Sequence, residues 1–171
     1  RNQVTKNAYY GSDNKLLRYY TVDFNANGMP VKTSYFGSDG KLSRDANLSE
    51  HVAVVTADYD DRNRKIDRRC YDENDHLLRI LENGQYAYAG LKVVYTKGCK
   101  ETFFYDENET VYQSTVEEYD EYDRLVNRIY CDGDGNQLVR HEVSYNERGR
   151  VTSDALYNGQ DELQADETSG V

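Results

Sequence analysis

The sequence predicts an all-β fold, an antiparallel β-meander built as a repeat array. Three observations predict it. An aromatic residue followed by a four-residue turn recurs along the chain, apolar residues between the turns tend to occupy every second position, and the apolar content is low for 171 residues. Clear copies of the aromatic-plus-turn segment begin at Tyr71, Tyr105, Tyr119 and Tyr145. A chain made of copies of one short unit specifies an array rather than a globule around a single core.

The last aromatic residue before each turn, called the anchor here, defines the period. Short and long steps between anchors alternate, so the repeating unit is two steps. The predicted units are residues 10–36, 36–71, 71–105, 105–130 and 130–157, with partial units at both ends. Two units are longer, at 34 and 35 residues against 25 to 27 for the others. The anchors are Tyr10, Phe24, Phe36, Tyr59, Tyr71, Tyr95, Tyr105, Tyr119, Tyr130, Tyr145 and Tyr157.

The residues of the turn indicate its geometry. A hairpin loop built on a type I turn needs its last residue at positive φ, where glycine is unstrained and asparagine or aspartate is tolerated. Nine of the eleven anchors are followed four places later by one of these residues: Asn14, Gly28, Gly40, Asn63, Asp75, Asp123, Asp134, Gly149 and Asp161. The turns after Tyr95 and Tyr130 are irregular in spacing, since Gly98 comes one place early and Gly135 one place late, and Glu109 departs from the rule. Asp or Asn directly after the anchor, as at Asp60 and Asn146, is expected to close the loop with a side-chain to backbone hydrogen bond.

Between the turns the residues predict strands. Val139, Val143 and Tyr145 are separated by multiples of two residues, so they fall on one face of a half-buried strand. No stretch shows convincing helical spacing. Tight turns every 10 to 15 residues make neighbours in sequence neighbours in the sheet.

Composition limits how the sheet is packed. Only 37% of the residues are hydrophobic, tryptophan is absent and mean hydropathy is −0.95. These are too few apolar side chains to fill the core of a two-layer sandwich of this size. Seventeen tyrosines, stacked on one another about 4.8 Å apart across the ladder, are expected to supply the missing contacts. We therefore predict an open, twisted, single-layer sheet or a β-solenoid-like array, forming one elongated domain over residues 1–171. Residues 160–171 begin another unit, so we expect a fragment of a longer chain whose unpaired terminal strands could self-associate.

The repeated unit resembles a known family. A tyrosine, an acidic or amide residue, two variable residues, glycine or asparagine and then a basic or apolar residue are similar to the YD (tyrosine-aspartate) repeats of the RHS type, with Arg64, Arg124 and Arg150 at the basic position. Residues 83–87, Asn-Gly-Gln-Tyr-Ala, look like the Gly-Tyr-Ala stretch of such units with one insertion. The resemblance implies a β-meander in a bacterial cell-surface or secreted protein, and it implies no catalysis. Glucan- and choline-binding cell-wall repeats fit less well, because their units are shorter and rely on tryptophan.

Charge and cysteine usage restrict the partners. A net charge of −10 repels a phosphate backbone and an anionic membrane, so no nucleic-acid partner is expected. No apolar run approaches the roughly 20 residues of a membrane span. Cys70, Cys99 and Cys131 are odd in number and occupy different repeat positions, so three free thiols are expected, with one disulfide pair as the open alternative.

We identify no catalytic or metal-binding constellation and expect no cofactor. Residues 132–136 resemble half of a calcium loop, but Val143 stands where its bidentate glutamate belongs, so a turn explains them. His51, His76 and His141 show no metal-ligand spacing. Glu117 and Glu118 point to opposite faces of a strand and cannot act together on a glycosidic bond.

One aromatic loop is the candidate ligand site. Tyr86 and Tyr88, with Asn83 before them, fall in the extra length of a long unit, so the two rings could project beyond the sheet. Exposed tyrosines stack on sugars and offer a hydroxyl for hydrogen bonding. The alternative is that the rings fold back over the sheet as a local core.

Two functional classes follow. The first is a non-enzymatic repeat module of a bacterial surface or secreted protein, acting as a spacer or as a surface that binds an envelope glycan or protein. The alternative is a scaffold or shell segment of a larger toxin-like or cell-envelope enzyme.

Overall fold

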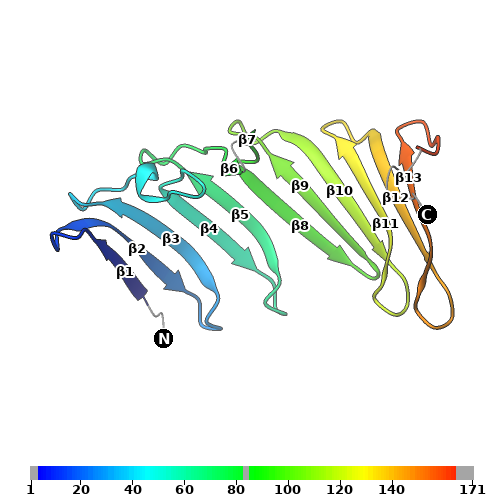
Figure 1. Cartoon of the computed structure of the whole chain (residues 1–171), viewed down its shortest axis with the longest axis horizontal. Helices are drawn as coiled ribbons and strands as arrows, with labels where there is room; N and C mark the ends of the chain where they lie inside the picture. The colour runs from blue at the N-terminus through cyan, green and yellow to red at the C-terminus, as the bar shows by residue number, and fades with distance from the viewer. Residues whose placement is uncertain (1–3, 83–84, 165–171) are drawn as a thin grey trace. The chain divides into compact units, whose positions relative to one another are not determined.

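The computed structural model describes residues 4–82 and 85–164 (Figure 1). Eleven strands form one antiparallel sheet in which the strands follow one another in chain order, and two short strands form a separate ribbon. β1 and β13 are the two edges, so the sheet is open. The predicted all-β meander is confirmed, in its open-sheet form.

The elements have the following bounds. The large sheet contains β1 (Val4–Tyr10), β2 (Leu16–Phe24), β3 (Pro30–Gly37), β4 (Val54–Tyr59), β5 (Lys65–Tyr71), β8 (Gly90–Thr96), β9 (Cys99–Tyr105), β10 (Val111–Tyr119), β11 (Leu125–Asp132), β12 (Gln137–Tyr145) and β13 (Val151–Asn158). The ribbon pairs β6 (Leu81–Glu82) with β7 (Gln85–Tyr86), and the only helical element among the described residues is the 3₁₀ turn η1 (Arg44–Ala46).

The chain divides into two compact units. One comprises Arg1–Lys92 with Phe104–Thr110, and the other comprises Val93–Phe103 with Val111–Val171. The first unit contains both long connections, residues 42–53 and residues 77–89, called the first and second excursions here. The second unit contains β10 to β13, joined by tight turns.

The turns have the predicted chemistry. In the turn after Tyr59, the carboxylate of Asp60 accepts the backbone N–H groups of Arg62 and Arg64 at 2.9 and 2.8 Å. Asn63 closes the type I turn at φ 59°, and the strand register shifts by one residue at the anchor, as in a hairpin with a bulge. The same carboxylate or amide contact recurs at seven further turns, those that begin at Asn25, Asp72, Asp106, Asp120, Asp132, Asn146 and Asn158.

One anchor needs correction, and one exception to the residue rule keeps the geometry of the turn. After β11, Cys131 occupies the place of the anchor, and Gly135 rather than Asp134 takes positive φ, at 86°. Glycine is preferred there because a left-handed conformation brings a side chain too close to the backbone. Glu109, which departs from the residue rule, nevertheless has φ 62°. The hairpin geometry therefore prevails over the residue's own preference at that turn.

The anchor tyrosines join consecutive hairpins. Cross-strand pairing between β11 and β12 ends at Asn127 and Glu142, and beyond that point the Tyr145 hydroxyl donates a hydrogen bond to the Leu125 carbonyl at 2.9 Å. Tyr59 makes the equivalent bond to the Pro30 carbonyl at 3.1 Å. At these two anchors the hydroxyl thus satisfies a backbone acceptor where two hairpins diverge, a contact that phenylalanine could not make.

The predicted stacking of aromatic rings on one another is only part of the packing. Tyr19 and Phe36 stack with centroids 4.6 Å apart. Several anchors instead lie under a guanidinium from another strand or turn: Arg69 over Tyr105 at 4.6 Å, Arg124 over Tyr145 at 4.6 Å and Arg140 over Tyr157 at 4.1 Å. Arginine on an aromatic face combines apolar contact with electrostatic attraction.

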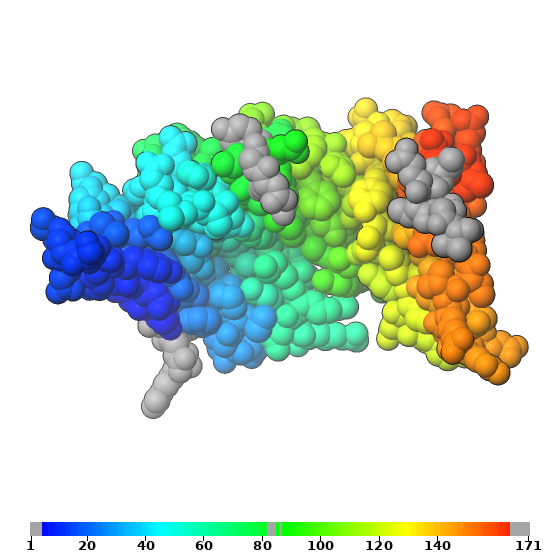
Figure 2. Space-filling model, viewed as in Figure 1, coloured from blue at the N-terminus to red at the C-terminus, as the bar shows by residue number. Residues whose placement is uncertain are grey.

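The most deeply buried cluster lies under the excursions of the first unit. Val52 and Cys70 are 0% exposed and Ile80 is 3% exposed, and they come from the first excursion, β5 and the second excursion respectively. Each excursion therefore folds back on the sheet and buries apolar groups against it. Figure 1 shows both excursions at the same ends of their strands, and Figure 2 shows the residues of the first excursion, in cyan, at the upper rim of the surface.

Candidate functional site

The predicted aromatic loop is only partly described. Asn83 lies outside the described residues. Tyr86 lies in β7, where its backbone pairs with Leu81. Tyr88 is described in full, and it takes the inward of the two alternatives: its ring packs against the buried cluster of Val52, Cys70 and Ile80. A sugar-binding role for the three residues stays a prediction.

Tyr88 is held by two neighbours. Its hydroxyl accepts a hydrogen bond from Nη1 of Arg68 at 2.9 Å, and its ring lies 5.6 Å from that of Phe104. Burial raises the pKa of Tyr88 above its ordinary value, although Arg68 acts in the opposite direction. Tyr88 therefore remains a neutral hydroxyl at physiological pH, suited to hydrogen bonding inside the protein.

Arg68 joins the two excursions to the sheet. It projects from β5, its side chain is 11% exposed, and its Nη2 donates to Oε1 of Glu50 at 2.5 Å. Glu50 belongs to the first excursion and Tyr88 to the second, so one guanidinium bridges both. This interaction of Arg68 with Glu50 and Tyr88 was not apparent from sequence. Arg68 is 18 residues from Glu50 and 20 residues from Tyr88, and no local pattern connects residues at such separations.

Cys70 lies beside Arg68 and Tyr88, and burial makes its thiol unreactive. Its side chain is fully buried, and burial raises the pKa of the thiol to about 11. A thiol in that state is a weak nucleophile at neutral pH. All three cysteines are free in the structure.

A line of charged side chains crosses the strands of the second unit. Lys100 Nζ lies 2.6 Å from Glu117, and Arg128 Nη2 lies 2.7 Å from the other oxygen of the same carboxylate. Burial opposes ionisation, but hydrogen bonds from Lys100 and Arg128 lower the pKa of Glu117 below its ordinary value. Glu118 instead accepts a hydrogen bond from Asn127 at 2.8 Å. The two adjacent glutamates therefore have separate partners, and neither is available as half of a catalytic pair.

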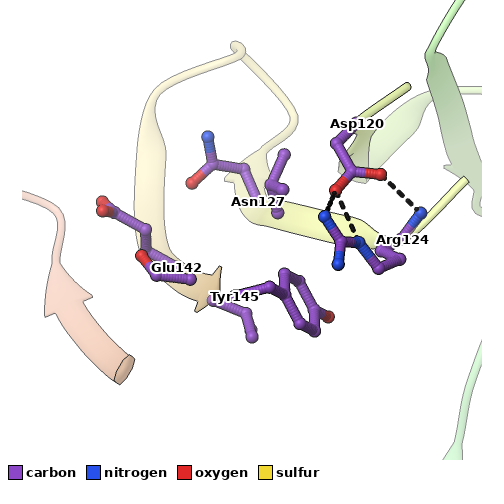
Figure 3. Close-up of a pocket in the computed structure, with 8 residues that line it drawn as sticks. Asp120, Arg124, Asn127, Glu142 and Tyr145 are labelled. Carbon is purple, nitrogen blue, oxygen red and sulfur yellow. Dashed lines mark hydrogen bonds and ion pairs between the residues drawn. The ribbon is translucent and has the colours of Figure 1, made fainter. Parts of the chain in front are cut away.

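A shallow pocket lies at the end of the second unit where β11 and β12 diverge (Figure 3). It encloses about 360 Å³, and its polar lining includes Asp120, Arg124, Asn127, Glu142 and Tyr145. Figure 3 shows Arg124 turned toward Asp120, with the Tyr145 ring beside it. The nearest Arg124 nitrogens are 2.7 Å from Asp120 Oδ2, and Arg140 pairs with Glu142. Asp120 and Glu142 are thus both ion-paired with arginine side chains of the protein, so neither carboxylate of the pocket is without a partner.

The remaining sequence candidates behave as turn or strand residues. Oδ1 of Asp132 accepts the backbone N–H groups of Asp134 and Asn136 at 3.0 and 2.8 Å, as the turn interpretation predicts. His141 pairs with Asp154 across two strands. Over residues 4–82 and 85–164, no group of three or more His, Cys, Asp or Glu side chains has a metal-binding arrangement, and no helix is long and apolar enough to cross a membrane.

A row of aromatic rings crosses the first three strands, from an exposed ring at Tyr9 to half-buried rings at Tyr20 and Tyr35. Tyr9, Tyr20 and Tyr35 lie on successive strands with centroids 6.4 and 5.8 Å apart, and the Arg18 guanidinium lies 4.6 Å from the Tyr9 ring centre. Tyr9 is 44% exposed. The aromatic pairs at residues 9–10, 19–20 and 35–36 are the sequence signal for this row, but which rings share a face depends on register.

No protein family matches the chain, and no curated protein is significantly similar to it.

Proposed function

We propose that this chain is a non-catalytic repeat module of a bacterial surface or secreted protein, and that it binds an envelope glycan through the aromatic row of its first strands, with the exposed Tyr9 as the main contact. The observation that carries the proposal is the row formed by Tyr9, Tyr20 and Tyr35. The resemblance to YD repeats supports the bacterial surface or secreted setting.

The row has the chemistry that sugar chains require. Sugar rings pack their C–H faces on aromatic rings, and tyrosine adds a hydroxyl for hydrogen bonding. Arg18 supplies further donors beside the outermost ring. Rings repeated from strand to strand suit an extended polysaccharide better than a compact metabolite. With a net charge of −10, a neutral or cationic glycan is favoured over an anionic one.

The state of the charged groups supports a non-catalytic role. Catalytic acids and bases are held with perturbed pKa values in a cleft that admits substrate. Here Glu117 is saturated by Lys100 and Arg128, and Asp120 is closed off by Arg124. These carboxylates stabilise strands and turns instead of facing a substrate.

Glycan-array binding of the purified chain tests the proposal. Wild-type protein should bind a subset of neutral or amino-sugar polysaccharides, and Tyr9→Ala should reduce that signal at least tenfold without changing the thermal midpoint by more than about 2 °C. Tyr122→Ala is the matched control, because Tyr122 is 67% exposed in a turn of the other unit. Equal binding by wild type and Tyr9→Ala, or no binding to any glycan, would reject the glycan role.

The aromatic loop can be tested in the same experiment. Tyr86→Ala probes the loop, because the backbone of Tyr86 pairs with Leu81 in the separate β6–β7 ribbon. Loss of binding in Tyr86→Ala with full binding in Tyr9→Ala would move the site from the aromatic row to the loop.

A further inference from the structure

The chain after β13 repeats the beginning of both excursions. In each excursion an isolated bridge follows the anchor turn, and the residue after the bridge donates a backbone hydrogen bond to the residue before the anchor. The bridges are Phe36 with Leu42, Tyr71 with Leu77 and Tyr157 with Leu163. The hydrogen bonds are Ser43 to Tyr35 at 3.0 Å, Leu78 to Cys70 at 2.9 Å and Gln164 to Leu156 at 2.8 Å. Residues 157–164 thus form a third copy of the same start.

The first two copies show what such a start leads to. Each excursion ends at a buried alanine whose carbonyl accepts the backbone N–H of the residue before the anchor: Ala53 from Tyr35 and Ala89 from Cys70, both at 2.8 Å. The chain then pairs antiparallel with the strand it left, as β4 on β3 and β8 on β5. The outer edge of that strand is covered in both cases.

β13 has the same edge without a cover among the described residues. It is the last strand in the sheet order, and Leu156 holds the position of Tyr35 and Cys70. Leu156 is 40% exposed and Leu163 is 67% exposed, whereas Cys70 is 0% exposed. Within residues 4–82 and 85–164, a strand edge without a neighbouring strand therefore coincides with apolar side chains that are more sheltered in the earlier copies, the combination that marks a strand-binding edge.

We propose that the outer edge of β13 binds an antiparallel β-strand of the β4 type, with a small residue at its start and β-branched residues after it. Its first carbonyl would accept the Leu156 N–H, and its apolar side chains would cover Leu156 and Leu163. Main-chain bonds supply affinity in this mode of recognition, and alternate side chains supply selectivity.

The direction of the strands favours this occupant over head-to-tail stacking of whole copies. In the order of the antiparallel sheet, β1 is the first and β13 the eleventh strand, so both have the same place in the alternation of strand direction. A second copy added by simple continuation would therefore place its β1 parallel to β13 and break the antiparallel ladder. Pairing of two β13 strands about a two-fold axis is the competing arrangement.

Hydrogen exchange on the full chain tests the proposal. The probe is a synthetic peptide with the sequence of residues 50–59, EHVAVVTADY, added at millimolar excess. Backbone amides alternate in direction along a strand, so those of Leu156 and Asp154 face outward and that of Ala155 faces β12. With nine-tenths of the protein bound, exchange at Leu156 and Asp154 should slow about tenfold, while Ala155 should not change.

A proline peptide is the matched control. Val55 pairs with Thr33 in the β3–β4 ladder, so a peptide with Val55→Pro loses a main-chain donor and should protect neither amide. Unchanged exchange with the wild-type peptide, or equal slowing with both peptides, overturns the proposal. Concentration-dependent protection of the same amides without peptide, together with a dimer in sedimentation, would assign the edge to a second copy instead.

Discussion

Removing the carboxylate of Glu50 should destabilise the first unit strongly, because it leaves a charged guanidinium without its partner. Arg68 is 11% exposed, so water cannot replace a lost counter-ion well. Glu50→Ala keeps the hydrogen bond from Arg68 to Tyr88 but removes the bond to Oε1 at 2.5 Å. Arg68→Met is the informative comparison, since it removes the buried charge and retains an apolar side chain of similar length.

The magnitude follows from the exposure of the two partners. Breaking a fully buried pair by deleting one member costs about 3–5 kcal/mol, and an exposed pair contributes at most about 1 kcal/mol. Glu50 is 29% exposed, so partial hydration of the site should bring the cost of Glu50→Ala to about 2–3 kcal/mol. Arg68→Met should cost less, about 1–2 kcal/mol, because the remaining Glu50 carboxylate can be hydrated.

Urea unfolding at pH 7, followed by circular dichroism, measures both free energies. Glu73→Ala is the control, since Glu73 lies 3.8 Å from an exposed Arg44 and its loss should change the unfolding free energy very little. The reasoning is refuted if Glu50→Ala is no more destabilising than Glu73→Ala. It is also refuted if Arg68→Met costs more than Glu50→Ala.

Four further predictions concern the turns, the anchors and the buried thiol. Tyr145→Phe should lower the free energy of unfolding by about 1 kcal/mol in urea, through loss of one hydrogen bond to a backbone carbonyl. Glu109→Gly should raise it by about 0.5–1 kcal/mol, because glycine relieves a side chain held at φ 62°; an unchanged or lower value would contradict this. The hydrogen bond from the Arg124 side chain holds the pKa of Asp120 below its ordinary value of 3.8, so its contribution is complete at neutral pH and is lost as the pH falls through about 4 and below; the urea midpoint of Asp120→Asn should decline less over that range. Cys70 should resist a thiol-specific reagent at pH 8 in the native state and react on unfolding, and fast native labelling would show that its burial is not maintained.

The hairpin turns could be predicted from sequence because their geometry is local. Five or six consecutive residues determine whether Asp60 can close its own loop and whether Asn63 tolerates positive φ, and the structure confirms both. The turn after Tyr130 differs, because its residue of positive φ was not determined locally. Residues 132–136 offer two glycines and two aspartates, and only the pairing of β11 with β12 selects Gly135 for the left-handed position.

The candidate sites could be predicted far less well, because they depend on contacts between distant segments. Sequence indicated extra length around Tyr88, but its inward orientation requires Arg68 and Phe104, which belong to other strands. The row that begins at Tyr9 likewise depends on the register of three strands, because a shift of one residue moves every ring to the opposite face.

The amino-acid sequence by itself determined the all-β class, the order of the hairpins and the chemistry of each turn, since backbone sterics and neighbouring side chains act over a few residues. Only the tertiary structure decided where the excursions fold, that guanidinium groups cover several anchor rings, and that Arg68 unites two excursions. These features depend on the free energy of burying apolar groups together and of pairing charged groups away from water. Both involve residues that are far apart along the chain.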